Sequence, residues 1–221
     1  MIARQSNREF WLALFAILVV SALYFLVITV RGQIPAASGF FGHMIGVIGF
    51  LLMLMTEILY SLRKRSRSAR WGRMSSWLSF HIFTGIVGPY MILLHSAWSF
   101  KGLAGIVTLM TVLIVVSGFI GRYIYTSIPR SAEGIEIESS AIEQEIHYIE
   151  DELKTLDRSQ SKHLRQLLKR QDTLQRQAAS LMTTRRLLSL WHTVHIPLGI
   201  ALFTAAFIHI GAALYYATLL H

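Results

Sequence analysis

Two stretches of the sequence decide its fold: WLSFHIFTGIVGPYMILLHSAW (residues 77–98) and WHTVHIPLGIALFTAAFIHIGAALYY (residues 191–216). Neither contains Asp, Glu, Lys or Arg, and each carries two histidines fourteen residues apart: His81 and His95 in the first, His195 and His209 in the second. A helix of about 20 apolar residues is long enough to cross a bilayer. We therefore expect these histidines to lie in a membrane, where polar side chains are costly and usually functional.

Three further apolar stretches, of which only the second contains a charged residue (Glu57), bring the number of predicted membrane spans to five. They are Phe10–Val30, Phe40–Leu62 and Gly102–Gly121, while the two quoted stretches fall within Met74–Phe100 and Leu187–Leu220. The chain of 221 residues is 53% hydrophobic and 15% charged, whereas soluble domains are about 25% charged. The sequence thus predicts an all-α membrane protein and excludes a disordered chain.

The distribution of basic residues predicts the orientation of the spans. The external connections hold only Arg31 and only Lys101, whereas six basic residues crowd the connection between the second and third spans: Arg63, Lys64, Arg65, Arg67, Arg70 and Arg73. Because cytoplasmic loops are enriched in Lys and Arg, this connection and the N-terminus are expected on the cytoplasmic side of a cell (inner) membrane, with the C-terminus external. The net charge of +9 is then a topology signal, and we expect no nucleic-acid partner.

One long polar segment, residues 129–186, separates the fourth span from the fifth. Residues 131–157 contain nine acids and one base, and residues 158–186 contain eight bases and one acid. Two stripes of apolar residues at 4-3 spacing run through the two halves, which is typical of coiled coils. The stripes are Ile142, Ile146, Ile149, Leu153 and Leu156, then Leu164, Leu167, Gln171, Leu174, Ala178 and Leu181.

These patterns predict three regions along the chain. Residues 1–128 form the first four spans, residues 129–186 form a cytoplasmic antiparallel coiled-coil hairpin, and residues 187–221 form the fifth span. No Gly or Pro occurs from Arg158 to Ile196, so the second half of the hairpin is expected to run unbroken into the fifth span. The hairpin is expected to dock a redox partner protein or a second copy of the chain.

The spacing of the four histidines has a direct geometric meaning. Fourteen residues of α-helix bring two side chains within about 40° of one face, about 21 Å apart along the axis. The third and fifth spans run in the same direction in the predicted topology. His81 therefore matches His195 in depth (the inner pair), and His95 matches His209 (the outer pair).

Two stacked imidazole pairs are the arrangement that two bis-histidine haems require, in a bundle with apolar walls. The expected iron ligands are His81, His95, His195 and His209. The sequence has no Cys, which excludes iron–sulfur clusters and covalently attached haem. We expect two non-covalent haem b groups in a four-helix-type di-haem bundle.

Three glycines lie close to the histidines. Gly85 and Gly88 follow His81 by four and seven residues, and Gly199 follows His195 by four. Glycines on the ligand face would give a flat porphyrin room to approach. Close packing of membrane helices is an equally common reason for glycine at such positions.

Three polar residues at the ends of the spans are further candidates. His192 lies one turn before His195 but about 100° off the face of His209, so it is expected at the interface, near a haem propionate. Arg122 could pair with an inner propionate, or serve only as a topology signal. His43 begins the second span, where it could line a quinone pocket, bond a propionate or simply lie at the interface.

The doubled pattern, His81-x13-His95 with His195-x13-His209, resembles the di-haem b cytochromes. These include the cytochrome b of quinol-oxidising respiratory complexes and the transmembrane domain of the ferric reductase and NADPH oxidase family, whose ligands also lie on the third and fifth spans. The resemblance covers about Trp77 to Tyr216. It implies two haem b groups stacked across the membrane that pass single electrons, with a quinone as a candidate partner.

The sequence departs from both groups. It has no Pro-Glu-Trp-Tyr segment, which the quinol-oxidising group carries, and no flavin or nicotinamide domain follows the fifth span. We therefore expect an electron-transfer subunit of an oxidoreductase complex, in contact with lipid and a redox partner or forming a homodimer, rather than a self-sufficient enzyme.

A metal or proton transporter is the main alternative. A transporter of this kind should have acidic residues beside the histidines in the spans, and Glu57 is the only acidic residue within them. A membrane scaffold that recruits partners through the hairpin leaves the paired histidine spacing unexplained.

Overall fold

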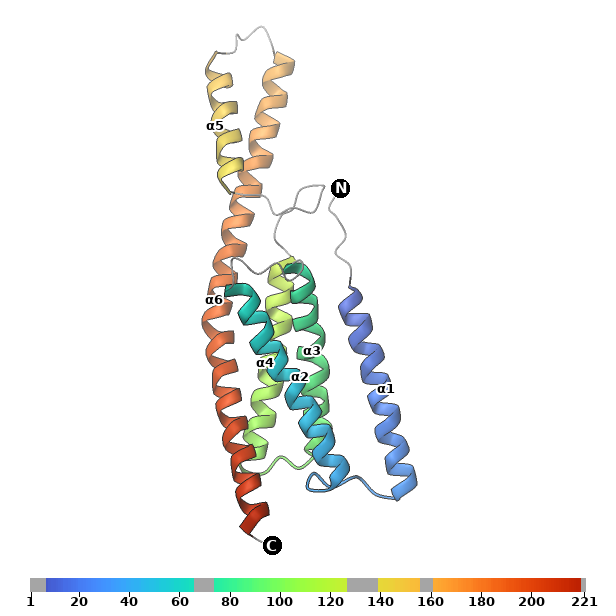
Figure 1. Cartoon of the computed structure of the whole chain (residues 1–221). Coiled ribbons are helices and arrows are strands. Elements are labelled where there is room, and N and C mark those ends of the chain that lie inside the picture. Colours follow the sequence, from blue (N-terminus) through green and yellow to red (C-terminus); the bar gives the residue numbers. More distant parts are fainter. Residues whose placement is uncertain (1–6, 66–73, 127–138, 156–160, 220–221) are drawn as a thin grey trace. The chain divides into compact units, whose positions relative to one another are not determined.

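The computed structural model of the chain describes residues 7–65, 74–126, 139–155 and 161–219. These residues form six α-helices (Figure 1): α1 (Arg8–Arg31), α2 (Phe40–Arg65), α3 (Met74–His95), α4 (Gly102–Thr126), α5 (Ser139–Thr155) and α6 (Ser161–Leu219). All except α5 are long and apolar enough to cross a membrane. The prediction of five membrane-spanning helices is thus confirmed at the level of length and composition.

Several sequence predictions fall on residues outside the described ranges. The start of the predicted polar segment (residues 129–138) and the connection between the two halves of the predicted hairpin (residues 156–160) are among them. So are Arg67, Arg70 and Arg73 of the basic connection, Leu156 of the first apolar stripe, and the C-terminal His221.

The chain divides into two compact units. The bundle unit comprises Ser6–Phe119 with His195–His221, and the arm unit comprises Ile120–Val194 with Met1–Gln5. These boundaries differ from the predicted ones after residues 128 and 186. The two unit boundaries fall inside continuous helices, because α4 extends past residue 119 and α6 is a single helix from Ser161 to Leu219. The expectation that the segment before the fifth span runs unbroken into it is confirmed.

In the bundle unit, α2 and α3 approach each other closely because glycines meet at their contact. A Cβ atom added to Gly88 would lie 2.9 Å from the Gly49 carbonyl oxygen and 2.9 Å from Cγ of Met53. Only a residue without a side chain fits there, as is common where membrane helices pack tightly. Helix α3 also packs against α1. The buried residues of this three-helix core are Ala13, Tyr24, Ile45, Val87, Met91 and Leu94.

A second core of the bundle unit joins α6 to α2 and α4 through Met53, Val107, Leu202 and Ala206. Leu202 is only 1% exposed. It lies seven residues after His195 and seven before His209, about two helical turns each way, so all three share one face of α6. The face of α6 that carries both histidines therefore points into the bundle at its midpoint.

The directions of the helices in the bundle unit agree with the predicted alternation. Helix α3 and the part of α6 that belongs to this unit run in the same direction, and α2 and α4 run in the opposite one (Figure 1). The histidines of α3 and α6 consequently follow each other in the same order along the bundle.

In the arm unit, α5 packs along the N-terminal part of α6. Contacts that lie late in α5 fall early in α6: Glu152 meets Nε2 of His163 at 3.0 Å, and Glu145 meets Nη2 of Arg170 at 2.7 Å. The two helices are therefore antiparallel. Their shared apolar core consists of Ile142, Ile149, Leu174 and Leu181, with Ile146, Leu153, Leu167 and Ala178 packed against it.

Candidate functional site

His81 on α3 is oriented by helix α2. Its Nδ1 lies 3.2 Å from the backbone carbonyl oxygen of Thr56. A carbonyl can only accept a hydrogen bond, so Nδ1 carries the proton, and in the neutral ring the lone pair is on Nε2. The Thr56 hydroxyl in turn lies 2.6 Å from that of Thr84, which is completely buried. This contact between two helices holds the carbonyl that His81 uses.

His195 on α6 is oriented by helix α4. Its Nδ1 lies 3.0 Å from the hydroxyl oxygen of Ser117. A hydroxyl can either donate or accept, so this contact allows the same tautomer as in His81 without requiring it. Both members of the inner pair are thus bonded through Nδ1 to a helix that carries none of the four histidines.

His95, in the outer pair, is oriented by helix α2 as well. Its Nδ1 donates to the carbonyl oxygen of Gly42 over 2.9 Å, which again leaves the lone pair of the neutral ring on Nε2. Gly46, one turn further along α2, lies directly against the ring. A Cβ atom at Gly46 would come within 2.8 Å of both Cγ and Nδ1 of His95, so the absence of a side chain makes room for the imidazole.

His209 on α6 completes the outer pair. It is partly buried and lies near enough to His95 for the two rings to interact electrostatically. Unlike the other three histidines, it makes no hydrogen bond to any of the described residues.

His43 lies at the start of α2, close to the outer pair. Its ring centroid is 6.3 Å from that of His95, and its side chain is exposed. Its Nδ1 lies 3.2 Å from the carbonyl oxygen of Gly39 in the preceding turn. The structure therefore brings His43 beside a predicted ligand, at a more accessible position.

The three glycines near the histidines face neighbouring helices. Gly88 is at the tight contact with α2, and a Cβ at Gly85 would lie 3.7 Å from Thr56 on the same helix. Gly199 faces α4, with Ile114 at 4.0 Å. The sequence leaves two roles open for these glycines, namely room for a porphyrin and close helix packing. The contacts seen here are helix-packing contacts.

His192 and Arg122 belong to the arm unit. The Nδ1 of His192 donates to the carbonyl of Leu188 in its own helix over 2.8 Å, and its ring lies edge-on to Trp191. This bond within α6 differs from the cross-helix bond of His195. Arg122 follows Gly121, which lies directly against the Trp191 ring.

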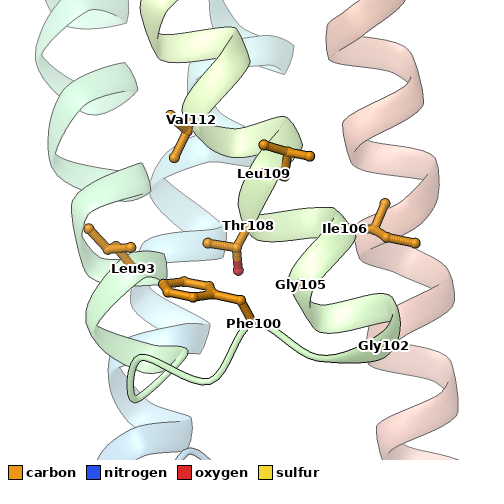
Figure 2. A pocket seen from close by; sticks show the side chains of 8 residues that line it. All are labelled: Leu93, Phe100, Gly102, Gly105, Ile106, Thr108, Leu109 and Val112. Carbon is orange, nitrogen blue, oxygen red and sulfur yellow. The ribbon is translucent and has the colours of Figure 1, made fainter.

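A cavity of about 480 Å³ opens between α3 and α4, near the end of α3 that carries His95. Figure 2 shows the Phe100 side chain, from the connection before α4, extending toward Leu93 of α3. Thr108 is the only polar side chain in the lining, and no charged residue contributes to it. The cavity is therefore suited to a hydrocarbon chain.

The residues that hold the histidines were not among those predicted from sequence. Thr56, Ser117, Gly42 and Gly46 lie on α2 and α4 and have no recognisable motif. The only available signal was the presence of small or hydroxyl residues inside apolar spans, which also serve ordinary helix packing.

Among the described residues, no group of three or more His, Asp or Glu side chains is arranged to hold a metal ion. No protein-family model, curated protein or solved structure matches the chain.

Proposed function

We propose that this protein is a membrane-embedded di-haem b-type cytochrome that carries single electrons from one face of the membrane to the other. The inner haem is held between His81 and His195, and the outer haem between His95 and His209. As an electron-transfer subunit it works with a redox partner protein, with a quinone as a candidate second partner.

One observation carries the proposal. Two pairs of histidines with the same fourteen-residue spacing lie on two helices that run in the same direction, and the α6 face between His195 and His209 is buried at Leu202. The spacing places the pairs at two depths about 21 Å apart. Matched pairs at two depths are the ligand sets that two haems stacked across a bilayer need.

The chemistry of the donors fits a haem iron. Iron binds the neutral imidazole, and a ligating histidine characteristically donates its other ring N–H to a neighbouring acceptor, which fixes the tautomer and orients the ring. His81 and His95 make such bonds to the carbonyls of Thr56 and Gly42, and Nδ1 of His195 has Ser117 beside it. These bonds leave the Nε2 lone pair of His81 and His95 as the one that can bind iron.

A haem iron between two imidazoles exchanges one electron and needs no open coordination position. The task of the chain is then to bind and orient the group and to exclude water. Helices α2 and α4 supply the oriented acceptors, and Gly46 leaves space for the His95 ring. The apolar residues at the level of Leu202, including Phe50 and Phe203, keep the region between the pairs dry.

The predicted topology completes the proposal. The basic connection after α2, the N-terminus and the arm unit lie on the cytoplasmic side, and the C-terminus lies outside. The antiparallel α5–α6 arm is a cytoplasmic coiled-coil hairpin. Because it carries charged flanks and lies on the inner side, it is the natural place for a cytoplasmic partner to dock.

The proposal is tested by purifying the full chain in detergent and recording its reduced-minus-oxidised spectrum. We expect the α and Soret bands of a six-coordinate haem b, removable by acid–acetone extraction because the haem is not covalently attached. A chain that is folded by circular dichroism but takes up no haem, even when haem is supplied during expression, contradicts the proposal.

The same preparation separates the two alternative classes. A metal or proton transporter shows no Soret band and moves its ion into proteoliposomes. A membrane scaffold shows neither property and loses its activity when the arm is deleted. The described residues do not favour the metal transporter, because no group of three or more His, Asp or Glu side chains among them could hold a metal ion.

A further inference from the structure

The N-terminal part of α6 carries a row of basic side chains on its outer surface. Lys162, Arg165, Lys169 and Arg176 are all exposed. At about 100° per residue, the four positions fall within about 60° of one another on the helix, and they cover about 21 Å of its length. We call these four residues the basic stripe.

The basic stripe faces away from α5. The apolar residues of α6 that pack against α5, Leu174 and Leu181 among them, centre on the far side of the helix, about 150° from the stripe. Because α5 covers the apolar side of α6, the stripe lies on a side of α6 that α5 leaves exposed.

Most other charges of the arm are already paired within it. Glu145 binds Arg170, Glu152 binds His163, and Asp151 binds Lys154. In the stripe, Arg176 shares its charge with Asp172 one turn away. Lys162, Arg165 and Lys169 have no acidic partner among the described residues.

We propose that the basic stripe is a docking surface for an acidic protein surface, with carboxylates spaced about one helical turn apart. Complementary charge of this kind raises the rate of association and makes binding sensitive to salt. Four cations over about 21 Å give one charge per roughly 7 Å, close to the 5.4 Å pitch at which an acidic helix repeats its side chains. This inference does not depend on the presence of haem.

The charge pattern argues against three other occupants. A second copy of the chain would have to offer the acids of α5, where Glu145, Glu150, Asp151 and Glu152 are already paired within the arm. Glu143 is then the one acid of α5 without an ion pair among the described residues, too few for four cations. Nucleic acid carries one phosphate per about 3.4 Å of each strand, a density that the stripe does not match, and the acids of α5 would repel it.

Anionic lipid headgroups are the third occupant. Arg176 lies eleven residues before Leu187, where the uncharged stretch of α6 begins, and Lys162 lies twenty-five residues before it. Along the helix these separations are about 16 Å and about 38 Å, beyond the Debye length of about 8 Å at physiological salt. Lipid charge is therefore screened along most of the stripe.

The test uses the full chain in phosphatidylcholine nanodiscs and two fluorescent helical peptides of identical composition. One peptide carries glutamates on a single face at i, i+3, i+7 and i+14, and the other has the same glutamates distributed around the helix. We expect the first to bind more tightly, and its binding to weaken when salt rises from about 10 mM to about 0.15 M, which shortens the Debye length from about 30 Å to about 8 Å.

Matched variants identify the surface. Lys162→Gln/Arg165→Gln/Lys169→Gln is expected to weaken binding of the one-faced peptide about tenfold, the effect of three weak surface ion pairs. Arg8→Gln/Arg31→Gln/Lys101→Gln makes the same change of net charge elsewhere and should leave binding intact. Lys162→Arg/Lys169→Arg keeps the charge and should also bind, which separates loss of charge from loss of folding.

Three results overturn the inference. The first is equal binding of the two peptides, and the second is an equal loss of binding in the two triple-glutamine variants. The third is a stripe-dependent binding of oligo-dT, or of nanodiscs containing phosphatidylglycerol, that exceeds the binding of the one-faced peptide.

Discussion

The inner and outer histidine pairs are similar in sequence but differ in how the fold holds them. In the inner pair, Nδ1 of His81 bonds to a carbonyl on α2, and Nδ1 of His195 bonds to a hydroxyl on α4. In the outer pair only His95 is held in this way, by the Gly42 carbonyl, while His209 makes no hydrogen bond to the described residues. The histidines thus have the same spacing on α3 and α6, but the two pairs differ in the hydrogen bonds that they make to α2 and α4.

This difference matters because the groups that hydrogen-bond to a metal-ligating histidine set the orientation of its ring and its basicity. A histidine whose Nδ1–H is donated to an acceptor is a more electron-rich ligand and favours the oxidised metal. Each pair has one histidine that donates Nδ1–H to a carbonyl, and the inner pair alone has a serine hydroxyl beside Nδ1 of its second histidine. This difference predicts two haems that are not equivalent, although the sequence repeats the same motif.

Removing a ligand has the largest expected effect and breaks one pair at a time. His81→Ala and His195→Ala should each lower the haem content from two to one per chain and leave the same residual haem, the outer one. His95→Ala and His209→Ala should leave the inner haem. The measurement is the pyridine haemochrome ratio together with the redox titration of the remaining haem.

His147→Ala serves as the control for this series, because His147 lies exposed on α5, outside the bundle unit. It should retain both haems. The proposal that His81 and His195 bind the same haem is contradicted if their variants leave residual haems that differ in spectrum or potential.

Filling the space beside His95 should disturb the outer pair alone. In Gly46→Ala, the new Cβ lies within 2.8 Å of two ring atoms of His95, so the ring must move. Overpacking of this kind costs about 1–3 kcal/mol. We expect a lower thermal midpoint and a reduced content of the outer haem, with the inner haem retained.

Gly118→Ala is the matched control, since nothing lies within 4 Å of a Cβ at that position of α4. Equal effects of the two glycine variants, or loss of the inner haem in Gly46→Ala, would show that Gly46 has no specific role at the outer pair.

A smaller change removes one hydrogen bond from the inner pair. Ser117→Ala leaves His195 in place but removes the hydroxyl 3.0 Å from its Nδ1. Binding of iron through Nε2, as proposed, requires Nδ1 to carry the proton and donate it to this hydroxyl, so without the hydroxyl the imidazole becomes a less electron-rich ligand. The inner potential should rise by up to about 40 mV, which corresponds to a hydrogen bond of about 1 kcal/mol for a one-electron couple. Potentiometric titration should show the outer haem unchanged.

Thr111→Val provides the comparison on the same helix, because the Thr111 hydroxyl bonds only to the Val107 carbonyl of α4. It should shift neither potential. A Ser117→Ala protein with an unshifted inner potential contradicts the proposed role of this hydroxyl.

The smallest effect is expected far from both pairs. In the arm, Lys154 holds the pKa of the exposed Asp151 carboxyl below its ordinary value of 3.8 through a side-chain hydrogen bond. A lowered carboxyl pKa stabilises the folded state above the pKa of the unfolded chain, and this contribution is lost as the pH falls through the folded pKa. In Asp151→Asn, the stability of the arm should therefore depend slightly less on pH in the acid range, and neither haem should change.

Circular dichroism of the full chain between about pH 5 and pH 2 measures this effect, because carboxylate linkage acts in that range. A change of haem content or potential in Asp151→Asn would show that the two pairs are sensitive to charges far along the chain, and would weaken the local explanation of their difference.

Much of this architecture could be predicted from the sequence because it depends on periodicities within single helices. Apolar stretches of bilayer length, interrupted by a charge only at Glu57, located all five apolar helices. The core residues Ile142, Ile149, Leu174 and Leu181 of the arm were identified by their 4-3 spacing. The shared face of His195 and His209 follows from helix geometry alone.

The supporting contacts could not be predicted, because they depend on how one helix is rotated against another. Nothing in the sequence says that Ser117 faces His195, or that Gly46 rather than Gly85 lies against a histidine ring. The predicted regions follow changes of composition at residues 129 and 187, whereas the compact units divide inside α4 and α6.

The assignment of the four histidines as haem ligands is best tested by the ratio of haem b to polypeptide in the purified full chain, measured for the wild type and for His95→Ala/His195→Ala. That double variant removes one proposed ligand from each pair. We expect a ratio of two in the wild type and a ratio near zero in the folded double variant. A wild-type ratio near zero, or a ratio that the double substitution leaves unchanged, contradicts the assignment.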